Sequence, residues 1–367
     1  MQLTPTLECW LRLSRAPGVG SATLLTLLES FGSPENIIGA SHMQLRRCIG
    51  DETAVLDGIT AEPDPVQLQS DVHWLQQDES HLVSILDEAY PPLLREIADP
   101  PALLYVRGDP SLLSMPQLAI VGSRNPTPAG AENARAFARA LTDSGLTVTS
   151  GFALGIDAAA HRGALEGNGK TVAVVGTGVD RVYPARHHQL AHEIARHGAI
   201  VSEYPLGTPP LRENFPRRNR ILSGLSLGTL VVEAALRSGS LITARLATEQ
   251  GREVFAIPGS IHSPLSKGCH QLIRQGAKLV ETANDVVEEL AALVGSLRQV
   301  SAATLAVRPE QQKNELLEYL GYDPIDIDTL VERSGLTPEA ISSMLLDMEL
   351  AGEVQTCAGG KYQRIHA

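Results

Sequence analysis

Two patterns of hydrophobic and polar positions alternate along the middle of the chain. Short apolar runs rich in β-branched residues are bounded by glycine, as at Leu118–Val121 and Leu230–Val232, and are typical of buried strands in a parallel sheet. A segment expected to be helical follows each run. This repetition predicts a doubly wound parallel sheet with right-handed crossovers. The predicted strands are Leu118–Val121, Thr147–Ser150, Thr171–Val175, Ala199–Ser202, Leu230–Val232, Glu253–Ile257 and Lys278–Glu281.

The segment before the sheet, up to about Asp87, is helical in pattern. Ser14–Gly20 predicts a hairpin between two helices, with Ser21 as the N-cap of the second. Its Gly-Val-Gly sequence can turn backbone N–H groups toward a phosphate, but a purely structural turn is favoured. A proline-rich connector follows and contains one short predicted strand, Ala102–Arg107.

The segment after the sheet predicts an acidic helix, Asn284–Leu297, a polar linker and a tail. The tail has the element order of a winged helix-turn-helix, with a hairpin at Glu353–Ile365. Its third helix, which Thr337 is expected to cap, carries three acidic residues and no Lys or Arg, so we expect it to contact protein rather than the major groove. The three predicted tail helices are Glu315–Leu320, Asp328–Arg333 and Pro338–Leu350. The predicted domains are residues 1–87, 88–297 and 313–367, with a linker at 298–312.

Charge is distributed unevenly along the 367 residues. The net charge is −12, which by itself disfavours a nucleic-acid partner. The segment from Leu118 to Thr282, however, contains 18 Lys and Arg and 12 Asp and Glu, a net charge of +6, so the flanking segments together carry a net charge of −18. This asymmetry predicts a basic central binding module with acidic companions. No apolar stretch is long enough for a membrane span and no secretory leader is present, so a cytoplasmic protein is expected.

A candidate phosphate site lies in Phe215–Ala244. This stretch combines an arginine cluster, a buried strand and a Ser-Gly-Ser turn that opens a helix, and the turn leaves backbone N–H groups free at a positive helix end. Gly122-Ser-Arg124 forms a second glycine turn with an arginine at its rim. Neither a dinucleotide fingerprint nor a nucleotide-hydrolysing P-loop is present, so the sequence predicts a phosphate that is bound and not cleaved. We expect Arg124 and the clustered arginines to share one rim of the sheet.

Catalytic and metal sites are weakly supported. Asp157 and His161 lie four residues apart on one predicted helix, and a packing hydrogen bond is favoured over a catalytic pair. Glu233 ends a predicted strand and is the best candidate for an acid or base, but we prefer Glu233 and Glu203 as partners of the nearby arginines. The histidines between 187 and 197 and the scattered cysteines make no convincing metal set. We expect no enzyme activity, cofactor or metal.

Together these blocks resemble the DprA (Smf) family of DNA-processing proteins. The matching blocks are VGSRNPT (121–127), SGFALGIDAAAH (150–161), GTGVDRVYP (176–184), SEYP (202–205), FPRRNRILSGLS (215–226), VVEA (231–234), SGSLITA (238–244) and FAIPG (255–259). The resemblance implies an α/β, extended Rossmann-like domain with an N-terminal SAM-like or helix-hairpin-helix domain and a C-terminal winged helix. It also implies a homodimer that binds and protects single-stranded DNA without sequence preference and loads RecA onto it during natural transformation.

The resemblance and the residue patterns together give a set of expected DNA contacts. They are Gly122, Ser123, Arg124, Lys170, Arg186, Arg217, Arg218, Asn219, Arg220, Ser238, Gly239, Ser240 and Lys267. His187 and His270 stand where relatives usually carry Asn. Two other functions remain open: a nucleotide hydrolase that uses Glu233, and a transcription regulator that uses the tail, which the acidic third helix disfavours.

Overall fold

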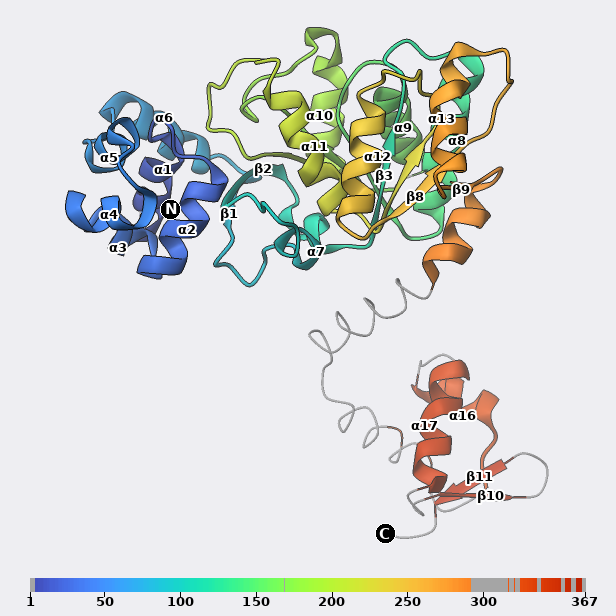
Figure 1. Ribbon diagram of the computed structural model, residues 1–367. Helices are drawn as coiled ribbons and strands as arrows, with labels where there is room; N and C mark the ends of the chain where they lie inside the picture. Colours follow the sequence, from blue (N-terminus) through green and yellow to red (C-terminus); the bar gives the residue numbers. More distant parts are fainter. Residues whose placement is uncertain are drawn as a thin grey trace. The chain divides into compact units, whose positions relative to one another are not determined.

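The computed structural model describes residues 4–167 and 169–291 and, toward the C-terminus, 316, 320, 324–334, 338–350, 354–357 and 361–364. Its contacts divide the chain into two compact units, Met1–Val294 and Gly295–Ala367 (Figure 1). Within the described residues, no helix is both long and apolar enough to cross a bilayer.

The first unit begins with six helices that pack around a core of their own. They are α1 (Pro5–Arg15), α2 (Ser21–Phe31), α3 (Pro34–Ile38), α4 (His42–Ile49), α5 (Thr53–Thr60) and α6 (Pro65–Leu75). Trp10, Leu27 and Leu56 are buried in this core together with Tyr105 from the sheet. The predicted hairpin between α1 and α2 is present, but Ser21 is the first helical residue rather than the N-cap. Gly20 takes the cap position, which frees the Ser21 hydroxyl for a contact outside the helix.

A nine-stranded sheet forms the centre of the unit, in the order β1-β2-β6-β5-β4-β3-β7-β8-β9. The strands are β1 (Ser80–Ser84), β2 (Leu103–Gly108), β3 (Gln117–Val121), β4 (Thr147–Ser150), β5 (Thr171–Val174), β6 (Ala199–Ser202), β7 (Gly228–Val231), β8 (Glu253–Ala256) and β9 (Lys278–Leu279). All neighbours from β6 to β9 pair in parallel, whereas β2 is antiparallel to both β1 and β6. The helical pattern up to Asp87 did not predict β1.

The order of the strands creates a switch point beside the central strand. From β3 the chain proceeds through β4 and β5 to β6, and it then returns to the other side of β3 to add β7, β8 and β9. In open α/β sheets, ligands bind beyond the carboxyl ends of the strands at such a point. The fold therefore predicts a ligand site at the loops that follow β3, β4 and β7.

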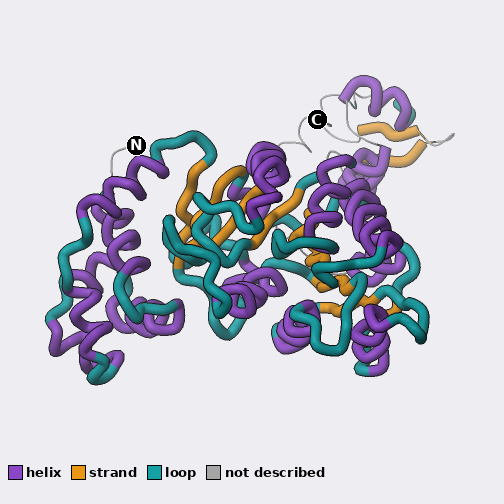
Figure 2. Tube along the Cα trace, turned by 90° about the horizontal axis from the view of Figure 1, so that it is seen from above, coloured by secondary structure: helices purple, strands orange, loops and turns teal. Residues whose placement is uncertain are grey.

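Helices cover both faces of the sheet (Figure 2). The two groups are α8 (Pro128–Asp143), α9 (Ile156–Glu166) and α10 (His188–His197), and α11 (Asn214–Gly224), α12 (Ser240–Glu249) and α13 (Lys267–Arg274); a short helix, α7 (Pro92–Arg95), contacts α11. Alternate residues of one strand enter different cores: Val172 packs in the cluster that contains Ile221 of α11, whereas Ala173 packs in the cluster that contains Leu190 of α10. Burial on both faces explains why Val172, Ala173 and Val174 of β5 are all apolar, as expected for a parallel sheet.

The second unit contains α16 (Ile327–Ser334), α17 (Pro338–Leu350) and the antiparallel pair β10 (Val354–Cys357) and β11 (Lys361–Arg364). Leu330, Ile341, Leu345 and Val354 are buried together. These elements match the second and third predicted helices and the predicted hairpin. The predicted linker, the first tail helix, the Thr337 cap and the second half of the helix Asn284–Leu297 fall outside the described residues, apart from Leu316 and Leu320.

Candidate functional site

A cavity of about 820 Å³ opens at the switch point of the sheet. Its walls come from the loops after β3, β4, β5, β6 and β7, together with the first turns of α11 and α12. Among the residues that line it are Gly122, Arg124, Arg218, Asn219, Ser238, Gly239 and Ser240. Seven of the predicted contacts, separated by more than a hundred positions in the sequence, therefore share one cavity.

The loop after β3 is held close to α9 by its glycine. A Cβ at Gly122 would lie 2.7 Å from the Ile156 side chain and 3.0 Å from the carbonyl oxygen of Glu233, so a larger residue would push the loop away. Ser123 stabilises the turn, because its hydroxyl accepts from the Asn125 amide at 3.1 Å and its carbonyl accepts from the Ile156 amide at 3.1 Å. Arg124 follows as an exposed side chain at the rim of the cavity.

Arg218 lies at the floor of the cavity and is only 4% exposed. Its Nη1 donates to the Val174 carbonyl at 2.6 Å, whereas its Nε has no hydrogen-bond partner among the described residues. Burial lowers the pKa of this guanidinium to about 10, and the nearby Asp157 opposes the shift. Burial likewise raises the pKa of Asp157, against the effect of the Arg218 charge. A Cβ at Gly151 would lie 2.3 Å from Nη1, so glycine makes the room that this arginine occupies.

The first turn of α12 supplies the opposite wall. The Ser238 and Ser240 hydroxyls lie 2.6 Å apart, and the Ser240 amide donates to Ser238 Oγ at 3.3 Å. Gly239 is exposed at the N-cap position, and a Cβ added there would meet no described atom within 4 Å. The first turn of this helix holds no acidic residue, so the positive end of its dipole faces the cavity. An anion that enters would meet the positive end of the helix and two serine hydroxyls, because the Ser240, Leu241 and Ile242 amides already donate within the turn.

An aromatic pair completes the cavity and was not among the predicted contacts. The rings of Tyr183 and Phe215 lie 5.7 Å apart, and Tyr183 is 51% exposed. Both residues belong to blocks that carried the family resemblance. They were missed because the predicted contacts were chosen mainly from basic residues and from glycine and serine turns. The signal in the sequence was an aromatic residue in each of these two blocks, because bases stack on aromatic rings.

Arg220, by contrast, has a structural position. Its guanidinium donates to both Glu203 carboxylate oxygens at 2.7 Å and to Asp99 at 3.0 Å, and it also contacts the Ser21 hydroxyl at 3.3 Å. Ser21 in turn donates to Glu203 at 3.3 Å. This network joins α11 to the connector and to the N-terminal helices. The expectation that the arginine cluster lies together on one rim is therefore wrong for Arg220.

Four other predicted contacts lie outside the cavity wall. Arg217 is exposed on α11, and Lys267 is the exposed first residue of α13. Arg186 lines a separate cavity of about 380 Å³ together with Arg162. Lys170 precedes β5 and so lies at the amino edge of the sheet, opposite the cavity. The DNA contacts implied for these residues stay predictions.

The two strand-end glutamates have different partners. Glu203 pairs with Arg220, as predicted. Glu233 does not pair with an arginine; its carboxylate accepts from the Thr127 amide at 2.9 Å and from the Thr127 hydroxyl at 2.6 Å. Thr127 is the N-cap of α8, so the Glu233 carboxylate holds the beginning of that helix. This contact could not be predicted from local patterns, because the two residues lie 106 positions apart.

His161 packs inside the protein, as predicted. The Thr171 hydroxyl donates to the Val148 carbonyl, so Nδ1 of His161 must donate to Thr171 Oγ1, 2.7 Å away. Its Nε2 is buried without a hydrogen-bond partner among the described residues, and burial lowers the pKa of this imidazole to about 3. The two histidines that replace the usual Asn make backbone contacts: His187 Nδ1 lies 3.3 Å from the Phe152 carbonyl, and His270 Nε2 lies 3.0 Å from the Gly259 carbonyl.

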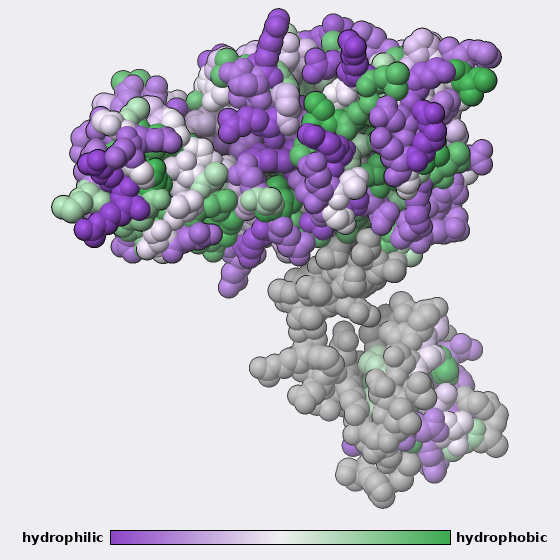
Figure 3. Space-filling view, in the orientation of Figure 1, coloured by the Kyte–Doolittle hydropathy of each residue, from purple (hydrophilic) through white to green (hydrophobic). Residues whose placement is uncertain are grey.

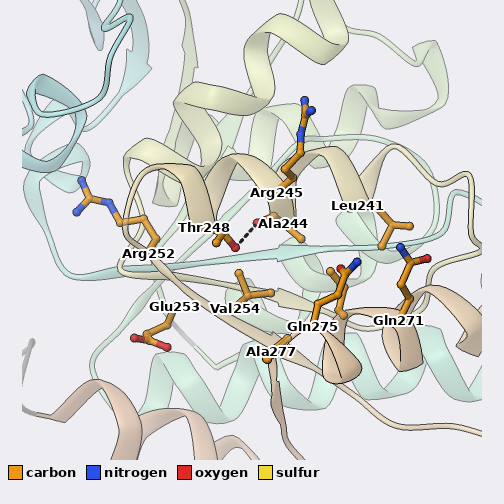
Figure 4. Close-up of a pocket in the computed structure, with 12 residues that line it drawn as sticks. Leu241, Ala244, Arg245, Thr248, Arg252, Glu253, Val254, Gln271, Gln275 and Ala277 are labelled. Atoms are coloured by element: carbon orange, nitrogen blue, oxygen red, sulfur yellow. Dashed lines mark hydrogen bonds between the residues drawn. The ribbon is translucent and has the colours of Figure 1, made fainter.

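A second groove, of about 490 Å³, lies between α12 and α13 (Figure 4). Leu241, Ala244 and Val254 form an apolar floor, and Arg245 and Gln271 stand at its sides. The Thr248 hydroxyl is turned back to the Ala244 carbonyl at 3.2 Å. This groove belongs to the outer part of the sheet, beside the edge strand β9.

Comparisons with known proteins agree with this architecture. Residues 81–291 match the family model of DNA recombination-mediator protein A, and residues 300–360 match the DprA winged helix domain. Protein Smf of Escherichia coli is 45% identical over 299 residues, 80% of each chain. The solved structure of DNA processing protein A from Streptococcus pneumoniae has a TM-score of 0.69 and 39% identity, covering 79% of this chain and 99% of that one. A Helicobacter pylori structure, described as showing a single-stranded DNA binding mode, has a TM-score of 0.53 and 32% identity, covering 58% and 96%.

Proposed function

The chain belongs to the DprA/Smf family of DNA recombination mediators, and we propose that it binds single-stranded DNA through the cavity at the switch point of the sheet. The observation that carries this proposal is the joint presence of Arg124, Arg218, the first turn of α12 and the exposed Tyr183 in one cavity. Arginine and hydroxyl donors suit the phosphate backbone, and an aromatic face accepts any base. Binding therefore tolerates any sequence.

Single-stranded DNA fits this cavity better than a duplex does. Tyr183 lines the cavity and is half-exposed, so a base must be unstacked from its neighbours before it can stack on this ring. Unstacking costs little in a single strand and several kcal/mol in a duplex. The structure of the relative from Helicobacter pylori, which is described as showing single-stranded DNA binding, supports this choice of substrate.

Binding to labelled oligonucleotides over a range of salt concentrations tests the proposal. We expect tighter binding of a single strand than of a duplex of the same sequence, and a decrease in affinity as salt rises. Arg139→Ala is the matched control, because it removes one exposed arginine near the end of α8, outside the cavity. The test variant is Arg124→Ala, which removes the arginine at the rim of the cavity and should weaken binding. Equal affinity for both forms of DNA, or an effect of Arg139→Ala as large as that of Arg124→Ala, would contradict the proposal.

We further propose that the protein has no hydrolytic activity. A nucleotide hydrolase that used Glu233 would need a free carboxylate beside a positioned water. Both oxygens of Glu233 are instead engaged by Thr127 at the start of α8. Nucleotides and single strands should therefore remain intact after long incubation with the protein, and hydrolysis that Glu233→Gln abolishes in a folded variant would overturn this.

The role in recombination is the next part of the proposal. The description of the matching family as a recombination mediator supports the expectation that the protein protects incoming DNA in the cytoplasm and loads RecA onto it during natural transformation. Two assays test it: protection of a bound strand from nuclease digestion, and the rate of RecA assembly on a strand coated with single-strand binding protein. A rate that is the same with and without this protein would rule out the loading role.

We propose that a second copy of the chain covers the groove between α12 and α13. The sheet ends there at the two-residue strand β9, whose Leu279 is 50% exposed, and hydrophobic residues are visible among hydrophilic ones over this region in Figure 3. An open sheet edge beside an apolar groove is suited to pairing with an identical element. Sedimentation should show a dimer for the native chain and a monomer for Leu279→Glu. A dimer that survives Leu279→Glu would place the interface elsewhere.

A further inference from the structure

The position of Arg218 is unusual for a residue that contacts only a passing strand. Its side chain is 4% exposed, and the hydrogen bond to the Val174 carbonyl leaves its Nε without a partner among the described residues. A buried guanidinium is costly unless all its donors are satisfied. Arg220 on the same helix shows the satisfied case, since two carboxylates and a hydroxyl surround it. Although Asp157 lies nearby, Arg218 therefore retains hydrogen-bonding capacity for an anionic ligand.

The depth of Arg218 restricts the kind of phosphate that reaches it. An internal phosphodiester carries two ester substituents, and both arms of the strand must leave the cavity again. A terminal phosphate monoester has one ester substituent, three free oxygens and a charge between about −1.5 and −2. It can therefore enter a closed floor with its oxygens first, while the single strand extends outward.

The remaining groups of the cavity fit such an end. Arg124 stands at the rim, and the first turn of α12 offers the Ser238 and Ser240 hydroxyls at the positive end of the helix. Three arginines line the cavity, Arg124, Arg212 and Arg218, and together with the positive helix end they outweigh its one lining acid, Asp157, so positive charge remains for a dianion. Tyr183, half-exposed on the same cavity, offers a ring on which the terminal base can stack.

We propose that this cavity seats the terminal phosphate monoester of a nucleic-acid strand, with Arg218 at the floor, Arg124 at the rim and the end of α12 at the side. This inference rests on the proposed function, because it specifies which part of the strand the same site holds. The strand is then gripped at its end as well as along its backbone. The same chemistry occurs in a free nucleoside monophosphate, which the experiment must distinguish.

The test compares oligonucleotides of one sequence that carry a phosphate at the 5′ end, at the 3′ end or at neither end. We expect one of the phosphorylated strands to bind at least about tenfold more tightly than the hydroxyl-ended strand, since charge-assisted hydrogen bonds are worth this much. Equal affinities of all three strands overturn the inference and leave the proposed function standing. Absence of binding to every strand defeats the proposed function itself.

Three variants locate the effect. Gly239→Asp places a carboxylate at the N-terminus of α12, where a side chain has room, and should remove the preference for the phosphorylated end. Asn133→Asp, which adds the same charge on the exposed part of α8, should retain the preference. Arg218→Lys should also remove it, and Gly239→Asp decides alone if Arg218→Lys does not fold. A preference that survives in Gly239→Asp overturns the inference.

A final arm separates the strand end from a free nucleotide. Millimolar deoxynucleoside monophosphate should displace the phosphorylated strand weakly, and the matching nucleoside should not displace it at all. If the free nucleotide stabilises the protein against heat while the three strands bind alike, the cavity is a nucleotide site, and the assignment to a strand end is wrong.

Discussion

Replacement of Arg220 by Met should damage the fold and spare DNA binding, although this residue lies within the arginine cluster. The guanidinium is 13% exposed, and its main partner, Glu203, is 11% exposed, so the substitution leaves a nearly buried carboxylate without its cation. Loss of one partner from a buried pair costs about 3–5 kcal/mol. Asp99, the third member, is 45% exposed and can turn to solvent, so its contribution is below about 1 kcal/mol.

The expected loss of unfolding free energy is therefore about 3 kcal/mol. For a unit of this size each kcal/mol lowers the midpoint of thermal unfolding by about 2–4 °C, which gives a decrease of about 6–12 °C. Urea unfolding followed by circular dichroism measures the loss, and Arg217→Ala, on an exposed neighbour, is the control, with an expected change within about 0.5 kcal/mol. In the double variant with Glu203→Gln the two losses should not add, because both remove one interaction.

Binding gives the second half of the test. Arg220 does not line the cavity, so the folded Arg220→Met protein should retain the affinity of the native chain for a single strand. Two results would refute the reasoning: an unfolding free energy unchanged by Arg220→Met, or a loss of affinity at a temperature at which the variant is fully folded. Either result would mean that the Glu203 network is not what holds this side chain.

Three further predictions follow from the site and its surroundings. Arg124→Ala should weaken binding equally for all sequences and should flatten the plot of log affinity against log salt by about one unit, and an unchanged slope in the folded variant would mean that the loop after β3 does not touch the strand. His161 is neutral in the folded protein, where its pKa is about 3, and titrates near 6.5 in the unfolded chain. The free energy of unfolding should therefore decrease as pH falls below 6.5, by about 2 kcal/mol at pH 5. Urea unfolding at pH 7 and pH 5 should show a smaller decrease in unfolding free energy for His161→Leu than for the native chain. The isolated tail from Gln312 should bind neither duplex nor single-stranded DNA at physiological salt, because its third helix has no basic residue, and submicromolar affinity in a filter-binding assay would contradict this.

The parallel core of the fold could be predicted because both of its signals are local. Most central strands are short apolar runs next to a glycine turn, and the chain repeats this unit in order, so hydrophobic pattern and topology agree. β1 was missed because Ser80–Ser84 mixes polar and apolar residues and becomes a strand by pairing with β2. Its conformation is imposed by a tertiary partner, which local propensity does not show.

For the site as well, local signals could be predicted from the sequence and tertiary contacts could not. Glycine turns and Ser238–Ser240 could be placed on the carboxyl edge because every parallel strand ends there. Which arginine faces the ligand could not be predicted, because Arg217, Arg218 and Arg220 occupy one helical turn and point in different directions around it. Arg218 points inward to the Val174 carbonyl, and Arg220 points to Glu203. Only the helix phase and the partners decide between them.

Glu233 gives a reason to place the proposed phosphate site at α12 rather than at the first helix after the central strand. In a dinucleotide-binding sheet, phosphate occupies the N-terminus of that first helix, which here is α8. The Glu233 carboxylate already accepts from Thr127 there, and a Cβ at Gly130 would fall 2.3 Å from its Cδ, so the carboxylate fills the space and supplies the negative charge. A phosphate would meet repulsion and too little room at α8. The N-terminus of α12 has neither obstacle, and Arg218 lines the same cavity. Under the proposed function, Glu233 therefore excludes the anion from α8 and leaves α12 as the helix that receives it.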